Sequence, residues 1–335
     1  MGVRVRGCRA AGLMLALAAP VEAQESRLLV VTGLGGEAQY SDAFHEWAIA
    51  MMDAAEKTYG VPASNITYLA EKPERDPARI KGPSTKVGIE KAFEELAGRL
   101  QPQDTVLVLL IGHGSSQSGD CRLNLPGPDL GGAELARLLD RLAPARVAVV
   151  NAFSASGDLS KTLAGKGRIV VTATKSGMER NETVFGRYFV EAFSGEGADV
   201  DKDGRVSILE AFDYARRQVA RFYEKENRLL TEHAMLEDSG DGIGSATPEP
   251  AHGDGARART WFLGGPAGDR RGAADPQLAA MQAERDELQQ RIEGLKSRKS
   301  GMDAAAYEAE LERLLLELAA RDQAIRKGRS KGEPR

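Results

Sequence analysis

The sequence has few cysteines, few aromatic residues and little excess charge. Its 335 residues include 2 cysteines and 5% aromatic residues, and the formal net charge is -4. Two cysteines cannot build a disulfide framework or a four-cysteine zinc site. The balanced charge excludes nucleic-acid binding driven by an overall basic surface. Because 42% of the residues are hydrophobic, the chain can bury a sizeable core, which excludes a wholly disordered protein.

Hydrophobic runs long enough to span a membrane are also missing. The apolar run at residues 10–19 is too short to cross a bilayer, follows three arginines, and is followed by a small-x-small motif that ends at Ala23. This pattern is typical of a secretory signal peptide, which we assign to residues 1–23. We therefore expect an exported protein, periplasmic or secreted, without a membrane span and with Cys121 as its remaining cysteine.

Short apolar runs alternate with helical patterns in the first half of the chain. The runs predict strands at residues 27–32, 66–69, 105–111, 146–150 and 168–172, and the patterns predict helices at 41–59, 85–100 and 132–142. Strands that are apolar throughout indicate a parallel sheet that is covered on both faces. We predict an α/β, doubly wound, mainly parallel fold for residues 24–264. Ligands of such sheets bind beyond the carboxyl ends of the strands.

The composition changes after residue 264. The Gly-rich residues 265–275 predict a linker. Heptad spacing of apolar residues over 276–327, with Arg285 at one seam position, predicts a coiled-coil helical hairpin outside the α/β core. An oligomerising coiled coil would explain the same spacing. The helices would offer a surface to a protein partner, and residues 328–335 are expected to be a disordered basic tail.

A glycine loop follows the first predicted strand. Residues 33–38 read Gly-Leu-Gly-Gly-Glu-Ala, which matches the dinucleotide fingerprint G-x-G-x-x-A. The fingerprint places its last position inside a helix, but the helix is expected to begin at Ser41. No acidic residue ends the second strand at the usual distance. The pattern therefore favours a tight turn built with left-handed glycines over a dinucleotide site.

Two loops at predicted strand ends carry residues suited to nucleophilic catalysis. His113 follows the third strand in the run Gly-His-Gly-Ser, and Ser154 follows the fourth in the run Ser-Ala-Ser-Gly. Because consecutive strands usually pair, we expect both residues at neighbouring strand ends. A histidine beside a hydroxyl can act as a base for a nucleophile. Asp120 and Asp129 are candidates for an acid behind the imidazole.

These two loops resemble those of the legumain-like and caspase-like cysteine peptidases, which carry a Gly-His-Gly loop and a Cys-x-Ser-Gly loop on consecutive strands. The resemblance covers about residues 27–193 and implies a caspase-like fold with His113 as the base. Ser154 stands where the nucleophilic cysteine belongs. The chain also looks like an uncharacterised bacterial caspase-like group, whose members carry runs similar to residues 125–129, 151–157 and 181–186.

The serine at the nucleophile position decides the functional expectation. A thiol is partly ionised near neutral pH, whereas a hydroxyl is not and needs an oriented histidine. We therefore expect a protein without cysteine peptidase activity that acts as a binding or scaffold module, with a peptide as candidate ligand of the cleft between His113 and Ser154. The alternative is an exported hydrolase, a peptidase with Ser154 as nucleophile and His113 as base.

The most specific motif is an acidic loop at residues 199–210. In an EF-hand calcium loop, oxygen ligands stand at positions 1, 3, 5, 7, 9 and 12 and a glycine at position 6. Here these positions hold Asp199, Asp201, Asp203, the Arg205 carbonyl, Ser207 and Glu210, with Gly204 at the turn. The sequence therefore predicts a bound Ca²⁺ ion. A second acidic run, residues 237–242, repeats part of the pattern and is either a degenerate half-site or an ordinary turn.

Overall fold

The computed structural model describes most of the chain after the predicted signal peptide. The described residues are 24–264 except 118, 196 and 252, then 276–296, 299 and 302–330. The predictions for residues 1–23, 265–275 and 331–335 fall outside them. Within this described part of the chain, no helix has both the length and the apolar character needed to cross a membrane.

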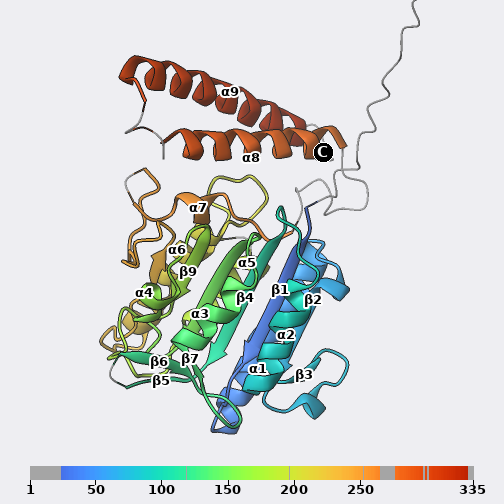
Figure 1. The fold of residues 1–335 in the computed structure, drawn as a ribbon, viewed down its shortest axis with the longest axis vertical. Coiled ribbons are helices and arrows are strands. Elements are labelled where there is room, and N and C mark those ends of the chain that lie inside the picture. The colour runs from blue at the N-terminus through green and yellow to red at the C-terminus, as the bar shows by residue number, and fades with distance from the viewer. Residues whose placement is uncertain are drawn as a thin grey trace, which may run out of the picture.

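A seven-stranded sheet forms the centre of the molecule (Figure 1). In spatial order its strands are β10 (Met235–Glu237), β9 (Arg168–Thr172), β8 (Arg146–Phe153), β4 (Thr105–Gly112), β1 (Ser26–Thr32), β2 (Ile66–Ala70) and β3 (Gly82–Pro83). All neighbouring pairs are parallel except β9 with the edge strand β10. The mainly parallel sheet confirms the predicted α/β class.

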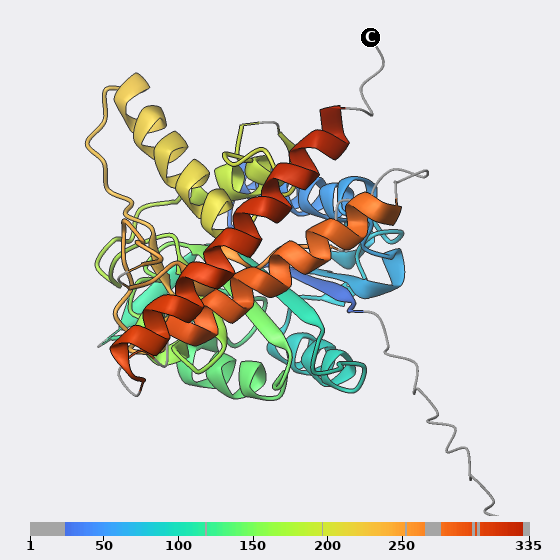
Figure 2. The ribbon, with the colours of Figure 1, turned by 90° about the horizontal axis from the view of Figure 1, so that it is seen from above.

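Helices cover both faces of this sheet, as a doubly wound fold requires (Figure 2). One face carries α1 (Ala38–Asp53, continued by a π-helical segment at Ala54–Thr58), α5 (Phe185–Ser194), α6 (Ile208–Lys225) and the short α7 (Ala256–Arg259). The other face carries α2 (Lys86–Ala97), α3 (Gly132–Asp140) and α4 (Leu159–Leu163). Each face therefore has its own hydrophobic core.

The two central strands explain why the sheet could be predicted from the sequence. Every residue of β4 is buried, and so is every residue of β8 after the first. Because helices cover both faces, neither set of alternating side chains meets water. Each position can therefore be apolar, and the strands appear in the sequence as continuous runs of valine, leucine and alanine.

The sequence predicted that helix α1 begins at Ser41, but the helix begins at Ala38. The carbonyl of Glu37 accepts hydrogen bonds from the N–H groups of Tyr40 and Ser41, so the first turn already forms there. The Ser41 hydroxyl donates to the Glu71 carboxylate at 3.3 Å and caps nothing. The predicted start at Ser41 is therefore three residues too late, and the Ser41 side chain, inside the helix, makes a tertiary contact.

A small antiparallel sheet was not predicted. It follows His113 directly and consists of β5 (Gly114–Gln117), β6 (Asp120–Leu123) and β7 (Leu130–Gly131). Its first strand is rich in glycine and serine, which have little strand preference, so the sequence gives no strand signal there. Its position directly after β4 attaches it to the carboxyl end of the central sheet.

The C-terminal helices α8 (Pro276–Lys296) and α9 (Ala304–Ser330) lie side by side across the end of the sheet where the strands begin (Figures 1 and 2). They share a third hydrophobic core, separate from the two of the α/β domain, formed by Leu288, Ile292, Leu295, Tyr307 and Leu314. Helix α9 ends at Ser330, so part of the segment expected to be a disordered tail is helical.

The separate core predicts how the protein responds to loss of its C-terminal helices. We expect a chain that ends at Gly264 to keep one cooperative unfolding transition, because neither core of the α/β domain includes a residue of α8 or α9. Its melting temperature should fall by no more than about 4 °C. Thermal unfolding followed by circular dichroism measures both quantities, and loss of cooperativity would show that the helices belong to the domain.

Candidate functional site

His113 and Ser154 follow paired strand ends. In the parallel pairing of β4 with β8, Gly112 is the register partner of Phe153, so His113 and Ser154 are the first residues beyond that last pair. The expectation of neighbouring strand ends is confirmed. The sheet order also places a change of winding direction between β1 and β4, the position where doubly wound sheets bind ligands.

The Ser154 hydroxyl is hydrogen-bonded to backbone. Its side-chain oxygen accepts from the Gly114 N–H at 3.0 Å and donates to the Gly114 carbonyl at 3.2 Å. Ser154 is 2% exposed. Among the described residues, no hydrogen bond joins this hydroxyl to His113. The serine therefore ties the start of β5 to the end of β8, and its proton is directed at a carbonyl instead of a base.

The close approach of the chain after β8 also requires a glycine at position 114. A Cβ atom at this position would lie 2.3 Å from the Ser154 carbonyl oxygen and 2.4 Å from the Phe153 ring, closer than real atoms approach. The glycine after the histidine thus has a packing reason that does not depend on catalysis.

The imidazole of His113 packs against aromatic rings of α1. Its centroid lies 4.8 Å from that of Tyr40 and 5.2 Å from that of Phe44, both in edge-to-face geometry. Burial lowers the pKa of His113, and the nearby Glu182 carboxylate opposes this only in part. The imidazole is therefore neutral at neutral pH and is positioned by its ring contacts.

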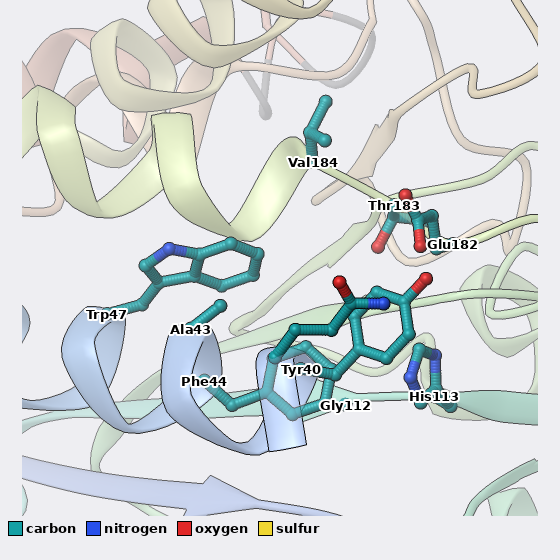
Figure 3. Close-up of a pocket in the computed structure, with 10 residues that line it drawn as sticks. Tyr40, Ala43, Phe44, Trp47, Gly112, His113, Glu182, Thr183 and Val184 are labelled. Carbon is teal, nitrogen blue, oxygen red and sulfur yellow. The ribbon is translucent and has the colours of Figure 1, made fainter. Parts of the chain in front are cut away.

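A cavity of about 180 Å³ opens beside this histidine (Figure 3). Tyr40, Phe44 and Trp47 of α1 line one side, and Glu182 with its neighbours lines the other. A hydrogen bond to Glu182 raises the pKa of the Tyr40 phenol, since it favours the protonated form. The cavity is aromatic with one carboxylate at its rim. Sequence analysis missed it because the aromatic residues of α1 have the spacing of an ordinary core face.

A buried carboxylate fixes the wall of this cavity. Glu232 accepts hydrogen bonds from the N–H groups of Val184 at 3.0 Å and Phe185 at 2.6 Å, at the start of α5. The side chain is 2% exposed. Burial raises the pKa of Glu232 to about 7, although both N–H groups favour the charged form. Glu232 thus holds the loop that carries Glu182 from a segment 48 residues further along the chain.

The glycine loop after β1 does not present free amides to a phosphate. The Glu71 carboxylate accepts from the Gly35 N–H at 3.3 Å, so a negative charge occupies the place where an anion would bind. The Gly33 N–H donates to the Ile111 carbonyl. A Cβ atom on Gly33 would lie 2.4 Å from the Asn124 carbonyl oxygen. The predicted left-handed conformation is present at Gly36, with φ 73°, whereas Gly33 and Gly35 permit close packing of the backbone.

The acidic loop 199–210 gathers three of its predicted ligands. One carboxylate oxygen each from Asp199, Asp201 and Asp203 lies within 4.8 Å of the others, a grouping that could hold a metal ion. Two left-handed residues, Lys202 at φ 59° and Gly204 at φ 77°, curl the backbone around them. The Asp199 carboxylate accepts from the N–H groups of Asp203 and Gly204, which fixes the curl.

Glu210 and Ser207 lie at the start of α6 and cap it. The Glu210 carboxylate accepts from the N–H groups of Val200 at 3.0 Å and Ser207 at 2.9 Å, and from the Ser207 hydroxyl at 2.8 Å. The Ser207 hydroxyl accepts from the Glu210 N–H, which completes a capping box. The cluster of three carboxylates does not include Glu210. This predicted ligand is engaged with backbone groups instead.

Arg205 has a role that the sequence did not predict. Its guanidinium lies 3.2 Å from the Asp203 carboxylate and 3.8 Å from the centre of the Phe262 ring. Burial raises the pKa of Asp203, but Arg205 and Arg285 overcome this and lower it overall. Burial raises the pKa of Asp201, and the charge of Asp203 adds to the effect. The loop thus gathers three carboxylates, and the charges of Arg205 and Arg285 act on one of them, Asp203.

The second acidic run, residues 237–242, accepts hydrogen bonds from backbone N–H groups. The Asp238 carboxylate accepts from the N–H groups of Gly255, Arg257 and Ala258, and so caps α7. The Glu237 carboxylate accepts from the Gly240 N–H. In the described part of the chain, the carboxylates of this run are not grouped with others as a metal site.

Cys121 is not placed as a nucleophile. It lies in β6, is 2% exposed, and pairs in register with Ser116. Burial raises the pKa of its thiol, which disfavours the reactive thiolate.

Comparison with known proteins returns no matching protein-family model and no matching curated protein. The resemblance to caspase-like peptidases therefore rests on the residues of the two loops and on the adjacent sequence runs.

The raised pKa of Glu232 predicts a pH-dependent stability. The folded state binds the proton more tightly than the unfolded chain, in which the pKa is near 4.5. This contribution is complete below about pH 4.5 and is lost as the pH rises through about 7, by an amount on the order of 1–3 kcal/mol. We expect Glu232→Gln to lose this part of the pH dependence, measured as free energies of unfolding in denaturant at pH 5 and 7.5. The exposed Glu224→Gln is the control, and equal slopes in all three proteins would contradict the assignment.

Proposed function

We propose that this protein is an exported, calcium-binding protein whose caspase-like α/β domain lacks peptidase activity and acts as a binding module. The observation that carries the proposal is the grouping of Asp199, Asp201 and Asp203 within one short loop. Export rests on the signal-peptide pattern of the sequence, and the caspase-like family on the two loops that follow β4 and β8.

The donor set supports calcium as the ion of an EF-hand-type loop. Carboxylates and a backbone carbonyl are hard oxygen ligands, and Ca²⁺ takes six to eight of them in flexible geometry, whereas Mg²⁺ demands a near-ideal octahedron. Glu210 would complete such a set by exchanging its hydrogen bonds to Val200 and Ser207 for the ion. The left-handed Gly204 at the sixth position meets the requirement for a sharp turn.

The second part of the proposal is binding without hydrolysis. Ser154 is buried and hydrogen-bonded to Gly114, and the neutral His113 faces aromatic rings. The cavity beside it has room for roughly one benzene-sized group. Aromatic faces next to the Glu182 carboxylate suit a cationic side chain, so we propose a peptide with a basic residue as the ligand. The heptad spacing and shared core of α8 and α9 support a coiled-coil hairpin that binds a protein partner.

Calcium binding is tested by calorimetry on the mature chain. We expect uptake of one Ca²⁺ ion, and we expect Glu210→Gln to weaken binding by at least about tenfold because it removes a charged, bidentate ligand. Glu224→Gln, an exposed change in the same helix, should leave the affinity unchanged. Absence of calcium uptake by the unmodified chain would reject the site.

Hydrolysis is tested with a peptide library. We expect no turnover by the unmodified protein, because the Ser154 hydroxyl donates to the Gly114 carbonyl and not to a base. Ser154→Ala, which lacks the hydroxyl, should behave in the same way. Turnover that disappears in both Ser154→Ala and His113→Ala would establish the alternative, a serine hydrolase. Activity only in Ser154→Cys would identify a peptidase scaffold that has lost its nucleophile.

A further inference from the structure

One residue of the C-terminal hairpin reaches the acidic loop. A guanidinium nitrogen of Arg285, in α8, lies 2.5 Å from a carboxylate oxygen of Asp203. Both side chains are almost fully buried, with 4% and 6% exposed. The hairpin, which has its own hydrophobic core, thus makes a buried ion pair with a predicted metal ligand of the α/β domain.

Arg285 occupies a seam position of the heptad pattern, and its guanidinium makes this ion pair with the α/β domain. Apolar residues of α8 at the neighbouring seam positions, Leu288 and Ile292, pack against α9 in the shared core. A buried guanidinium is costly unless a carboxylate compensates it. Asp203 supplies that compensation, so the position of α8 on the domain is linked to the charge at Asp203.

Two arginines share the Asp203 carboxylate, but they are held differently. Arg205 belongs to the loop itself and lies against Phe262, whose backbone bridges to Ser207. Both of these contacts lie within the α/β domain and do not involve the hairpin. Arg285 comes from a separate helix and is the positive charge that can leave.

A dication among Asp199, Asp201 and Asp203 would stand next to the Arg285 guanidinium, because both bind the same carboxylate. Like charges at such close range in a buried environment repel strongly. We infer that Arg285 competes with calcium for Asp203, so that calcium binding releases α8 from the loop and the docked hairpin lowers calcium affinity. This regulation rests on the proposed calcium site. Because coupling between two binding equilibria is reciprocal, calcium weakens the docking of α8 by the same factor by which docking weakens calcium binding.

Calorimetry on the full mature chain tests the competition. We expect Arg285→Gln to bind Ca²⁺ at least about tenfold more tightly than the unmodified protein, and Arg285→Lys, which keeps the charge, to stay within about threefold of it. Arg291→Gln removes the same charge from an exposed position of α8 and should change the affinity less than twofold. Unchanged or weaker binding by Arg285→Gln overturns the inference while the calcium site stands. Uptake by none of the proteins rejects the site and the competition together.

Amide hydrogen exchange tests the release itself. We expect saturating Ca²⁺ to speed exchange in α8 of the unmodified protein several-fold. In Arg285→Gln, exchange should already be fast and should not respond to Ca²⁺. Glu210→Gln, at calcium concentrations too low to fill its weakened site, should keep the slow exchange of the calcium-free protein. Unchanged or slower exchange in the unmodified protein at saturation would show that the ion and the docked helix coexist.

Discussion

The parallel pairing of β4 with β8 is the constraint on which the rest of the structure depends. Both strands are buried on both faces, so their backbone groups can be satisfied only by neighbouring strands. The register that results, with Gly112 opposite Phe153, decides which residues emerge together at the carboxyl end. The His113 ring, the Ser154 hydroxyl and the small sheet that begins at Gly114 all take their positions from it.

Buried carboxylates on this scaffold share one physical solution. Glu232 and Asp238 each accept two or more N–H groups near the start of a helix, where such donors lack partners within the helix. Asp203 is different, because arginine side chains also compensate its charge. The proposed competition between Arg285 and calcium concerns this charge pairing.

The two candidate sites lie at opposite ends of the sheet and are joined by α5. The loop before this helix carries Glu182 and lines the aromatic cavity, and the acidic loop 199–210 follows its C-terminal end and leads into α6. Helices α5 and α6 contribute Phe189 and Phe212 to the same core. The cavity at the strand ends and the buried charges under the hairpin are thus both attached to the packed helices α5 and α6.

What the sequence determined by itself is local. Continuous apolar strands predicted the sheet because burial on both faces leaves a signal within each strand, and the spacing of Asp199, Asp201 and Asp203 predicted their grouping because a loop of that length with Gly204 folds on its own turn geometry. Only the tertiary structure decided the roles that depend on contacts between distant segments. The Ser154 hydroxyl is occupied by a backbone group 40 residues away, and Glu232 fixes a loop 48 residues away. Arg285, at a seam position of α8, forms an ion pair with Asp203 of a distant loop. No pattern within a helix or a loop can reveal such pairs, because packing of whole elements brings them together.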